Sequence, residues 1–442
     1  MAALTGKGSL LYSCKKKTGL GALLLNGAFI KGLLTLALPC FNLAGPMQLS
    51  FILLTLPDLL PGACFRPAPG VAVNNANFFA NVINSATSFN EMLWKAIGQC
   101  PNINVVHDQW WGRALETPGE DPYVVGRYTV NFMRGMQDVP GHDGGDPFLR
   151  PIKTSTCCNH TRFDYDARVM ERDMAETFLC PFEMCVWEGD ASSVMCSFNL
   201  VNGVPACTDA RLLSQTVRGD WGLYGYIVSD CDAVLTEDVR WLNLTGAEAS
   251  AAAIRAGLDL DCDQSWTVCE DDGKMMGDFL SNFILAAVAQ GKIRDVGPNQ
   301  ITITITPTRE SDIDNALRNQ FMTFMRVGYF DDDIPLYASL NETDICTAEH
   351  QSLALDGARQ GIVLLKNHDN LLPLDANKIH AVAMHGPHVM APERVIWMQA
   401  TQARPPCRYV TPREGISKHV KISHQAKTTI YVGGINLHIE MP

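Results

Sequence analysis

From about residue 71 onward, the chain alternates short apolar runs with longer stretches of helical periodicity. The runs that predict strands are 104–106, 192–199, 225–228 and 258–260, and the stretches that predict helices are 122–137, 210–218 and 247–256. Strands separated by helices at this spacing form a parallel sheet covered by helices, either open or closed into a barrel. We therefore expect an α/β domain in this part of the chain.

Polar residues directly follow several of the predicted strands. Ser229 and Asp230 come after the run at 225–228, and Asp261 comes after the run at 258–260. Folds of the α/β class place their active sites at the carboxyl ends of the strands. Asp230 and its neighbour Asp232 therefore offer two carboxylates, one of which can act as a nucleophile or base. The alternative role for such a residue is to cap a helix or to bond to a loop.

A second motif, over residues 111–122, combines an arginine with an acidic turn. Glu120 and Asp121 are suited to cap the following helix, because carboxylates stabilise a helix N-terminus and Pro122 fits the first helical turn. Arg113 is the residue of this motif that we expect to reach a ligand.

The second half of the chain contains a boundary between two domains. An amphipathic helix is predicted over 313–328, and a helix ending at Gln360 leads into a predicted strand at 361–366. Further strand-like runs occupy 380–384 and 428–432. We assign a first domain to 71–344 and a second to 345–442. The alternating Ile-Thr run at 301–306 is predicted to be an inserted loop or an exposed hairpin, with a risk of aggregation.

The first 70 residues differ from the rest of the chain, since they hold six basic residues and one acidic residue. Residues 32–57 carry no charge and are long enough to cross a bilayer, but three prolines interrupt them. A secretory signal is not convincing either, because the lysine cluster at 15–17 and Lys31 do not fit its pattern. We expect residues 1–70 to lie outside the main fold.

Composition and motifs exclude several functions. A net charge of −12 argues against nucleic acid as a partner. The fifteen cysteines form no CxxC pair, and the cluster of Cys157, Cys158 and His160 is predicted to be buried thiols beside a histidine, not a metal site. No phosphate-binding or dinucleotide-binding motif occurs either. Three glycosylation sequons begin at Asn159, Asn243 and Asn341, and they count only in a secreted chain.

Five motifs occur in order along residues 111–262. They are Trp-Gly-Arg to Gly-Glu-Asp-Pro (111–122), Cys-Cys-Asn-His (157–160), Ser-Val-Met-Cys-Ser-Phe-Asn with Val-Asn-Gly (193–203), Tyr-Ile-Val-Ser-Asp-Cys-Asp (226–232) and Gly-Leu-Asp-Leu-Asp-Cys (257–262). Together they resemble glycoside hydrolase family 3, and are most similar to its plant β-D-xylosidase branch. The resemblance covers residues 77–440 with gaps, whereas residues 1–70 do not resemble the family.

This resemblance implies an incomplete (β/α)8 TIM-like barrel followed by a partial α/β sandwich. It implies a retaining hydrolase without metal or cofactor, which removes terminal xylose or arabinose from wall oligosaccharides outside the cell. Matched residue by residue, Asp230 is the nucleophile that forms a glycosyl-enzyme. The same matching implies that the positions of the family's substrate pocket are occupied here by Arg113, Asn159, His160 and Phe198.

The sequence also departs from the family pattern. Asn159 stands where the family has lysine, and Phe198 stands where it usually has tyrosine. This sequence has no counterpart of the family's first barrel strand, nor of a helix and strand that the family has between the positions of Gln99 and Cys100. No residue can be nominated as the acid/base. Three hypotheses therefore stay open: a β-xylosidase-like hydrolase, a catalytically impaired remnant with at most weak sugar binding, and a protein attached to a membrane through residues 32–57.

Overall fold

The computed structural model describes part of the chain. The described residues are 79–98, 101–108, 110–111, 113–142, 146, 150–153, 155–158, 165–230, 233–235, 242–261, 279–289, 295–296, 303–304, 308–328, 330, 344, 346–375, 377–390 and 410–433. The predictions for residues 1–70, including the segment 32–57, fall outside them. No helix within the described ranges is long and apolar enough to cross a membrane.

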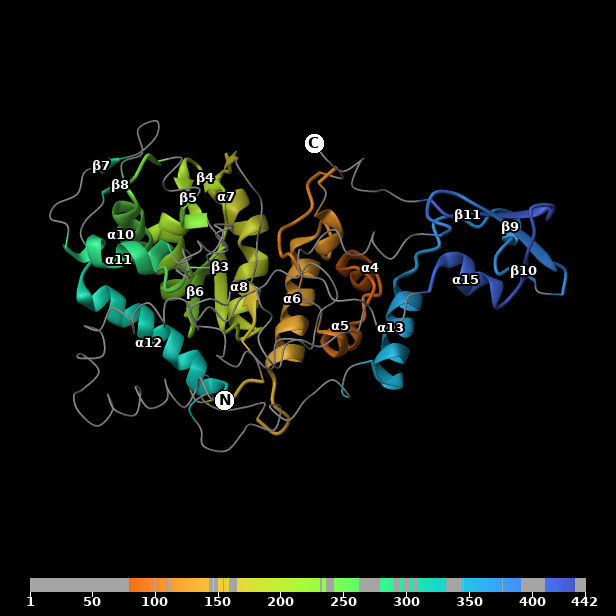
Figure 1. Cartoon of the computed structure of the whole chain (residues 1–442), viewed down its shortest axis with the longest axis horizontal. Helices are drawn as coiled ribbons and strands as arrows, with labels where there is room; N and C mark the ends of the chain where they lie inside the picture. Colours follow the sequence, from red (N-terminus) through yellow and green to blue (C-terminus); the bar gives the residue numbers. More distant parts are fainter. Residues whose placement is uncertain are drawn as a thin grey trace, which may run out of the picture.

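The described elements include both helices and strands, which are mixed along the chain (Figure 1). In order they are α4 (Val82–Ala86), α5 (Glu91–Ile97), η1 (Ala114–Glu116), α6 (Pro122–Gln137), β1 (Cys157–Cys158), β2 (Asp166–Ala167), α7 (Glu171–Asp173), η2 (Met174–Phe178), α8 (Cys180–Trp187), β3 (Ser193–Cys196), β4 (Leu200–Val201), β5 (Val204–Pro205), η3 (Ala206–Thr208), η4 (Arg211–Asp220), β6 (Tyr226–Ser229), α10 (Gly246–Ala256), α11 (Phe279–Ala289), β7 (Asp295–Val296), β8 (Ile303–Thr304), α12 (Glu310–Arg326), α13 (Ala348–Gly361), η8 (His368–Asn370), β9 (Ala381–His385), α15 (Pro412–Ser417), β10 (Lys421–Ile422) and β11 (Thr428–Tyr431).

The core of the first part is a parallel sheet with strand order β1-β3-β6. Cys196 at the end of β3 pairs with Ser229 at the end of β6, and both strands are buried along their length. One further parallel bridge joins Val228 to Leu260. The predicted α/β class and the strands within 192–199 and 225–228 are confirmed. The predicted strand at 258–260 is reduced to this single bridge.

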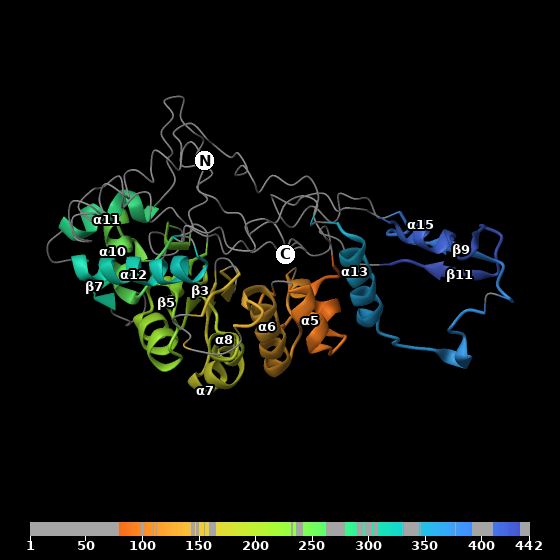
Figure 2. The same cartoon turned by 90° about the horizontal axis from the view of Figure 1, so that it is seen from below.

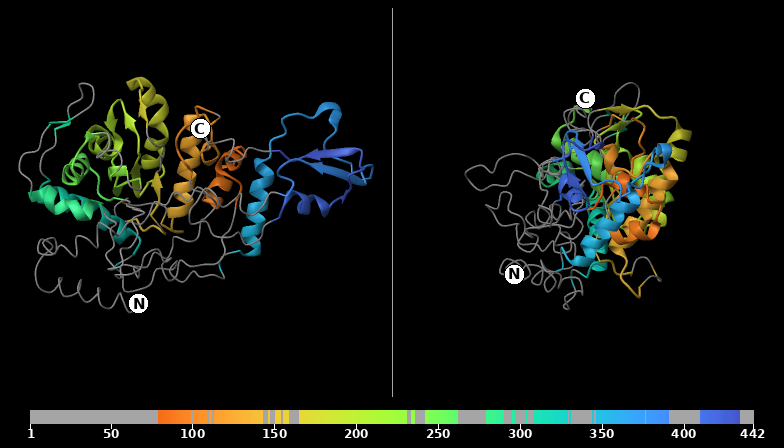
Figure 3. Two further views of the ribbon diagram at one scale, coloured as in Figure 1. Left: turned by 45° about the horizontal axis from the view of Figure 1, so that its top comes forward. Right: turned by 90° about the vertical axis from the view of Figure 1, so that its right-hand side faces the viewer.

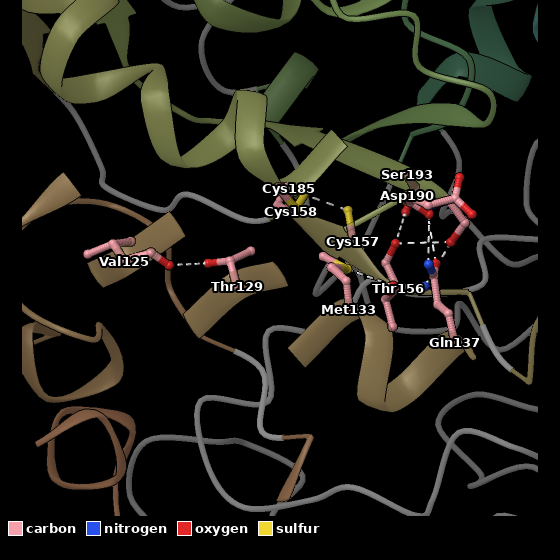
Figure 4. The surroundings of a disulfide bond; sticks show 11 residues. Val125, Thr129, Met133, Gln137, Thr156, Cys157, Cys158, Cys185, Asp190 and Ser193 are labelled. Atoms are coloured by element: carbon pink, nitrogen blue, oxygen red, sulfur yellow. Dashed lines mark hydrogen bonds between the residues drawn. A yellow bond between two sulfur atoms is a disulfide. The ribbon is translucent and has the colours of Figure 1, made fainter. Parts of the chain in front are cut away.

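Helix α6 begins where its sequence predicts. The Asp121 carboxylate accepts a hydrogen bond from the Val124 N–H at 2.9 Å, and Pro122 occupies the first turn. At its other end, Gln137 donates to the Asp190 carbonyl at 2.7 Å and accepts from the Ser192 N–H at 3.1 Å (Figure 4). The capping role predicted for Asp121 is confirmed, and the end of α6 fixes the start of β3.

A small second sheet has strand order β2-β4-β5. The antiparallel strands β4 and β5 are joined by Asn202 and Gly203, both with positive φ (52° and 87°), as a two-residue hairpin turn requires. The Asn202 side chain also bonds to both the N–H and the carbonyl of Val169, each at 2.9 Å. Asn202 therefore has a structural role in this turn.

The predicted strand at 104–106 is wrong, because these residues form a loop, in which Asn104 and Val105 are buried. Their side chains compete for the backbone: the Asn102 side-chain oxygen accepts from the Asn104 N–H, and the Asn104 side-chain oxygen accepts from the Val105 N–H, both at 3.1 Å. Asparagine commonly offers the chain such an alternative to a strand ladder.

The second part of the chain contains a parallel sheet with strand order β10-β9-β11, against which α15 packs (Figures 1 and 3). Its core consists of Val382, Met384 and Val389, with partly buried neighbours that include Ile416 from α15. The strands predicted near 380–384 and 428–432 are confirmed as β9 and β11.

Helix α13 lies between this sheet and the first part, beside α4 and α5 (Figures 1 and 2). The Thr87 hydroxyl donates to the Gly361 carbonyl at 2.8 Å, and the Asn90 side chain donates to the Gln360 side chain at 2.9 Å. The strand predicted at 361–366 is wrong, because the chain leaves α13 without pairing, and Ile362 and Leu365 are 78% and 92% exposed.

Two disulfides join elements around the central sheet. Cys158 of β1 is bonded to Cys185 of α8, and Cys196 at the end of β3 is bonded to Cys207 of η3. The prediction of a buried thiol is therefore wrong for Cys158, whereas Cys157 beside it is buried and remains a thiol. Strands β7 and β8 pair antiparallel, so Ile303 and Thr304 of the run at 301–306 belong to a pair of antiparallel strands, as the hairpin alternative predicts. The exposure of this run stays a prediction.

Candidate active site

The three parallel strands of the central sheet end at one common edge, and Asp230 is the first residue after β6 there. Its side chain is buried, and its N–H donates to the Cys196 carbonyl at 2.9 Å. Its own carbonyl accepts from the Ala233 N–H at 2.9 Å. The backbone of Asp230 is therefore held on both sides, by the neighbouring strand and by the next turn.

Ser229 and Asp261 form a buried contact immediately before Asp230. The Ser229 hydroxyl donates to an Asp261 carboxylate oxygen at 2.6 Å, and the Ser229 N–H donates to the Leu260 carbonyl at 2.9 Å. A hydrogen bond to a charged acceptor is among the stronger ones in proteins. It ties the end of β6 to the segment that follows α10.

Phe198 follows β3 at the same edge as Asp230. It is 5% exposed and belongs to the main hydrophobic core. The disulfide between Cys196 and Cys207 anchors the chain two residues before it. A phenyl ring packed in this way contributes apolar surface and no hydroxyl.

Arg113 precedes η1 on a separate loop, where it pairs with Glu116. Its Nε and Nη2 atoms both donate to one oxygen of Glu116, at 2.8 Å and 2.6 Å. Glu116 is buried, and this burial raises the pKa of its carboxyl, although the charge of Arg113 and its hydrogen bonds act in the opposite direction. Glu116 therefore fixes the guanidinium of Arg113, a role that the sequence motif did not reveal.

Asn159, His160 and Asp232 lie outside the described residues. Strand β1 ends immediately before Asn159, at Cys158, whose disulfide to Cys185 is shown in Figure 4. Within the described part of the chain, no group of three or more His, Cys, Asp or Glu side chains is placed to hold a metal ion.

Sequence reasoning also missed Asp259, a buried carboxylate behind β6. It accepts from the Ile227 N–H at 2.7 Å and from the Asn319 side chain at 2.9 Å, and it forms an ion pair with Arg218. Burial raises its pKa to about 6, against the lowering effects of Arg218, Asn319 and the Ile227 N–H. Asp259 thus links β6 to η4 and to α12.

The family model that matches this chain describes the N-terminal domain of glycosyl hydrolase family 3, and it covers residues 93–294. β-D-Xylosidase 1 of Arabidopsis thaliana is 37% identical over 88% of this chain and 49% of its own length. β-Xylosidase/α-L-arabinofuranosidase 1 of Medicago sativa subsp. varia is 36% identical over 87% of this chain and 50% of its own length. The chain thus spans about half the length of the curated relatives that it matches.

Solved structures show the same fold. A family 3 exo-β-xylosidase, in complex with a xylobiose aziridine activity-based probe, aligns with a TM-score of 0.68 and 24% identity over 84% of this chain and 50% of the other. An exo-1,3/1,4-β-glucanase from a Pseudoalteromonas species aligns with a TM-score of 0.66 and 22% identity over 83% of this chain and 47% of the other. From its ordered motifs, its matched domain and its relatives, the chain belongs to glycoside hydrolase family 3.

Proposed function

We propose that this chain carries the nucleophile and sugar-binding part of a retaining β-xylosidase site that releases terminal xylose from oligosaccharides. The observation that carries this proposal is the position of Asp230: a buried carboxylate directly after a buried parallel strand, with its backbone hydrogen-bonded on both sides. A nucleophile must be held close to its line of attack, and a rigid strand end supplies that placement.

In the proposed reaction, a carboxylate oxygen of Asp230 attacks the anomeric carbon of the terminal sugar. The bond from that carbon to the glycosidic oxygen breaks, and the leaving oxygen takes the electron pair and a proton. Water then attacks the glycosyl ester, loses a proton and releases Asp230 as a carboxylate. The family places the acid/base outside the matched motifs, and we assign no residue to it.

The proposed substrate pocket draws on four further residues. Arg113, oriented by Glu116, supplies charged donors for sugar hydroxyls. Asn159 and His160 follow β1, and Phe198 follows β3, in a fold where both strands end at the edge that bears Asp230. The relative named as a β-xylosidase/α-L-arabinofuranosidase supports arabinose as a second sugar.

We also propose the family's architecture and location for this chain. The parallel order β1-β3-β6 and the family 3 structures that match it support a barrel-type first domain, here 71–344. The parallel sheet β10-β9-β11 supports a sandwich-type second domain within 345–442. Plant xylosidase relatives and the two disulfides support a site outside the cell, with wall oligosaccharides as substrates.

The test is turnover of a nitrophenyl xyloside by the purified chain and by three variants. Asp230→Asn removes the nucleophile and should abolish release of nitrophenol. Asp220→Asn removes an exposed carboxylate at the end of η4 and should leave turnover unchanged. Asp230→Gly with added azide should recover turnover, because the small anion can enter the space of the missing carboxylate and attack the sugar. Full activity of Asp230→Asn would contradict the proposal.

A further inference from the structure

The sequon Asn243-Leu244-Thr245 lies in the loop immediately before α10. We propose that Asn243 is an N-glycosylation site of this protein. The ligand class is an oligosaccharide donated by a lipid diphosphate. This modification is separate from the proposed hydrolase activity and does not depend on it.

The local geometry presents Asn243 at the surface. Leu242 and Leu244 on either side are 6% and 4% exposed and belong to the main core, whereas Asn243 itself is exposed. Its backbone has φ of 51°, a left-handed conformation that asparagine adopts more readily than most residues. Two buried leucines thus anchor the loop while the asparagine between them faces solvent, which is where an attached glycan needs to be.

Thr245, the hydroxyl residue of the sequon, caps α10. Its hydroxyl accepts from the Glu248 N–H at 3.3 Å and donates to the Glu248 carboxylate at 2.9 Å, and the same carboxylate accepts from the Thr245 N–H at 2.8 Å. This capping box engages the hydroxyl in the folded chain. Glycan transfer is therefore expected to precede the formation of α10, while Thr245 is still accessible.

The disulfides support a compartment where this chemistry occurs. Cys158–Cys185 and Cys196–Cys207 are structural bonds of a kind that persists in oxidising compartments such as the secretory path. Transfer of the oligosaccharide takes place in the same path. The exposed sequon and the disulfides are independent observations that agree on this environment.

The transfer step is balanced without any oxidant. A bond forms between Nδ2 of Asn243 and the anomeric carbon of the donor oligosaccharide. The bond from that carbon to the lipid diphosphate oxygen breaks, and the diphosphate leaves with the electron pair. The amide nitrogen loses one proton to a base and remains an amide.

The topology also places the glycan relative to the candidate site. Because Val228 of β6 and Leu260 after α10 pair in parallel, α10 runs in the opposite direction to β6. The start of α10 therefore lies at the edge of the sheet where β6 ends. The glycan on Asn243 is expected on the same side of the molecule as Asp230.

The experiment uses the full chain, directed into the secretory path of a plant cell culture by an added signal peptide. An amidase that releases N-linked glycans converts the acceptor asparagine to aspartate. In heavy-oxygen water, the new carboxylate takes up one heavy oxygen atom, which serves as the label. We expect the peptide that contains Asn243 to carry the label only after amidase treatment. Asn159 and Asn341 are assessed from their own peptides, so their state does not affect the result.

Two variants form the matched controls. Asn243→Gln removes the acceptor and should increase electrophoretic mobility by the step of one glycan, whereas Thr245→Ser retains both the sequon and the cap and should keep the glycan. An unlabelled Asn243 peptide from the amidase-treated wild-type chain would overturn the proposal, as would equal labelling with and without amidase, which indicates spontaneous deamidation alone.

Discussion

The Ser229 hydroxyl donates a 2.6 Å hydrogen bond to the Asp261 carboxylate, and both groups are buried. This bond fixes the last residue of β6, directly before Asp230. We predict that Ser229→Ala and Asp261→Ala each lower the free energy of unfolding by about 1–3 kcal/mol, because each leaves a buried partner without this bond.

The double variant tests whether the two residues act together. In a urea-denaturation cycle, the coupling energy between Ser229→Ala and Asp261→Ala should be roughly 0.5–3 kcal/mol. Strictly additive effects would show that the contact does not hold β6 in place.

Glu116 is predicted to act on substrate binding through Arg113. Glu116→Ala releases the guanidinium and should raise KM for nitrophenyl xyloside about tenfold, which corresponds to about 1.4 kcal/mol of binding. The value of kcat should change little. Glu116→Gln keeps one hydrogen-bond acceptor for Arg113, so its KM should lie between those of the wild type and Glu116→Ala.

The control for Glu116 is Glu188→Gln, which weakens an exposed ion pair with Arg127 and should leave KM unchanged. An unchanged KM in Glu116→Ala, with the fold intact, would show that Arg113 does not bind substrate.

The raised pKa of Asp259 predicts a specific pH dependence of stability. The native chain keeps the Asp259 proton up to about pH 6, whereas the unfolded chain releases it near the ordinary aspartate pKa of 3.8. Asp259 therefore favours the folded state at low pH, and this contribution is lost as pH rises through about 6. Between about pH 4 and about pH 8, it amounts to about 3 kcal/mol.

Denaturation of Asp259→Asn across this pH range is the measurement, because asparagine cannot ionise. The fall in stability with rising pH should be smaller in Asp259→Asn than in the wild type, while Asp220→Asn should follow the wild type. Parallel curves for the wild type and Asp259→Asn would contradict the assignment.

The segment after α13 is predicted to promote self-association. Ile362, Val363, Leu364 and Leu365 are 78%, 55%, 61% and 92% exposed and belong to no strand, so they form an unusually apolar surface run. Val363→Lys combined with Leu365→Glu should reduce light scattering at high concentration and change the free energy of unfolding by no more than about 0.5 kcal/mol. Unchanged scattering would show that other surfaces drive association.

Local signals in the sequence predicted some elements well. Asp121 and Pro122 marked the start of α6, because caps and turns are encoded within a few residues. The helix predicted over 313–328 is α12, which spans Glu310–Arg326, and Gly328, with a positive φ of 71°, follows its end. The position of Asp230 followed from the apolar run before it. Family resemblance, not periodicity, supplied its proposed role.

Contacts between distant parts of the chain could not be predicted in this way. The pairing of Cys158 with Cys185, and of Asp259 with Arg218, depends on elements that meet only in the folded chain. Residues 361–366 have the apolar composition of a buried strand, but a strand needs a partner that local sequence does not specify.

Covalent trapping tests most directly whether Asp230 is the nucleophile. A fluorinated xyloside with a good leaving group forms a glycosyl-enzyme that is slow to hydrolyse, and peptide mapping by mass spectrometry then locates the sugar. We expect the label on Asp230 and none on Asp232, with no label in Asp230→Asn. Label on Asp232 or on any other carboxylate would contradict it.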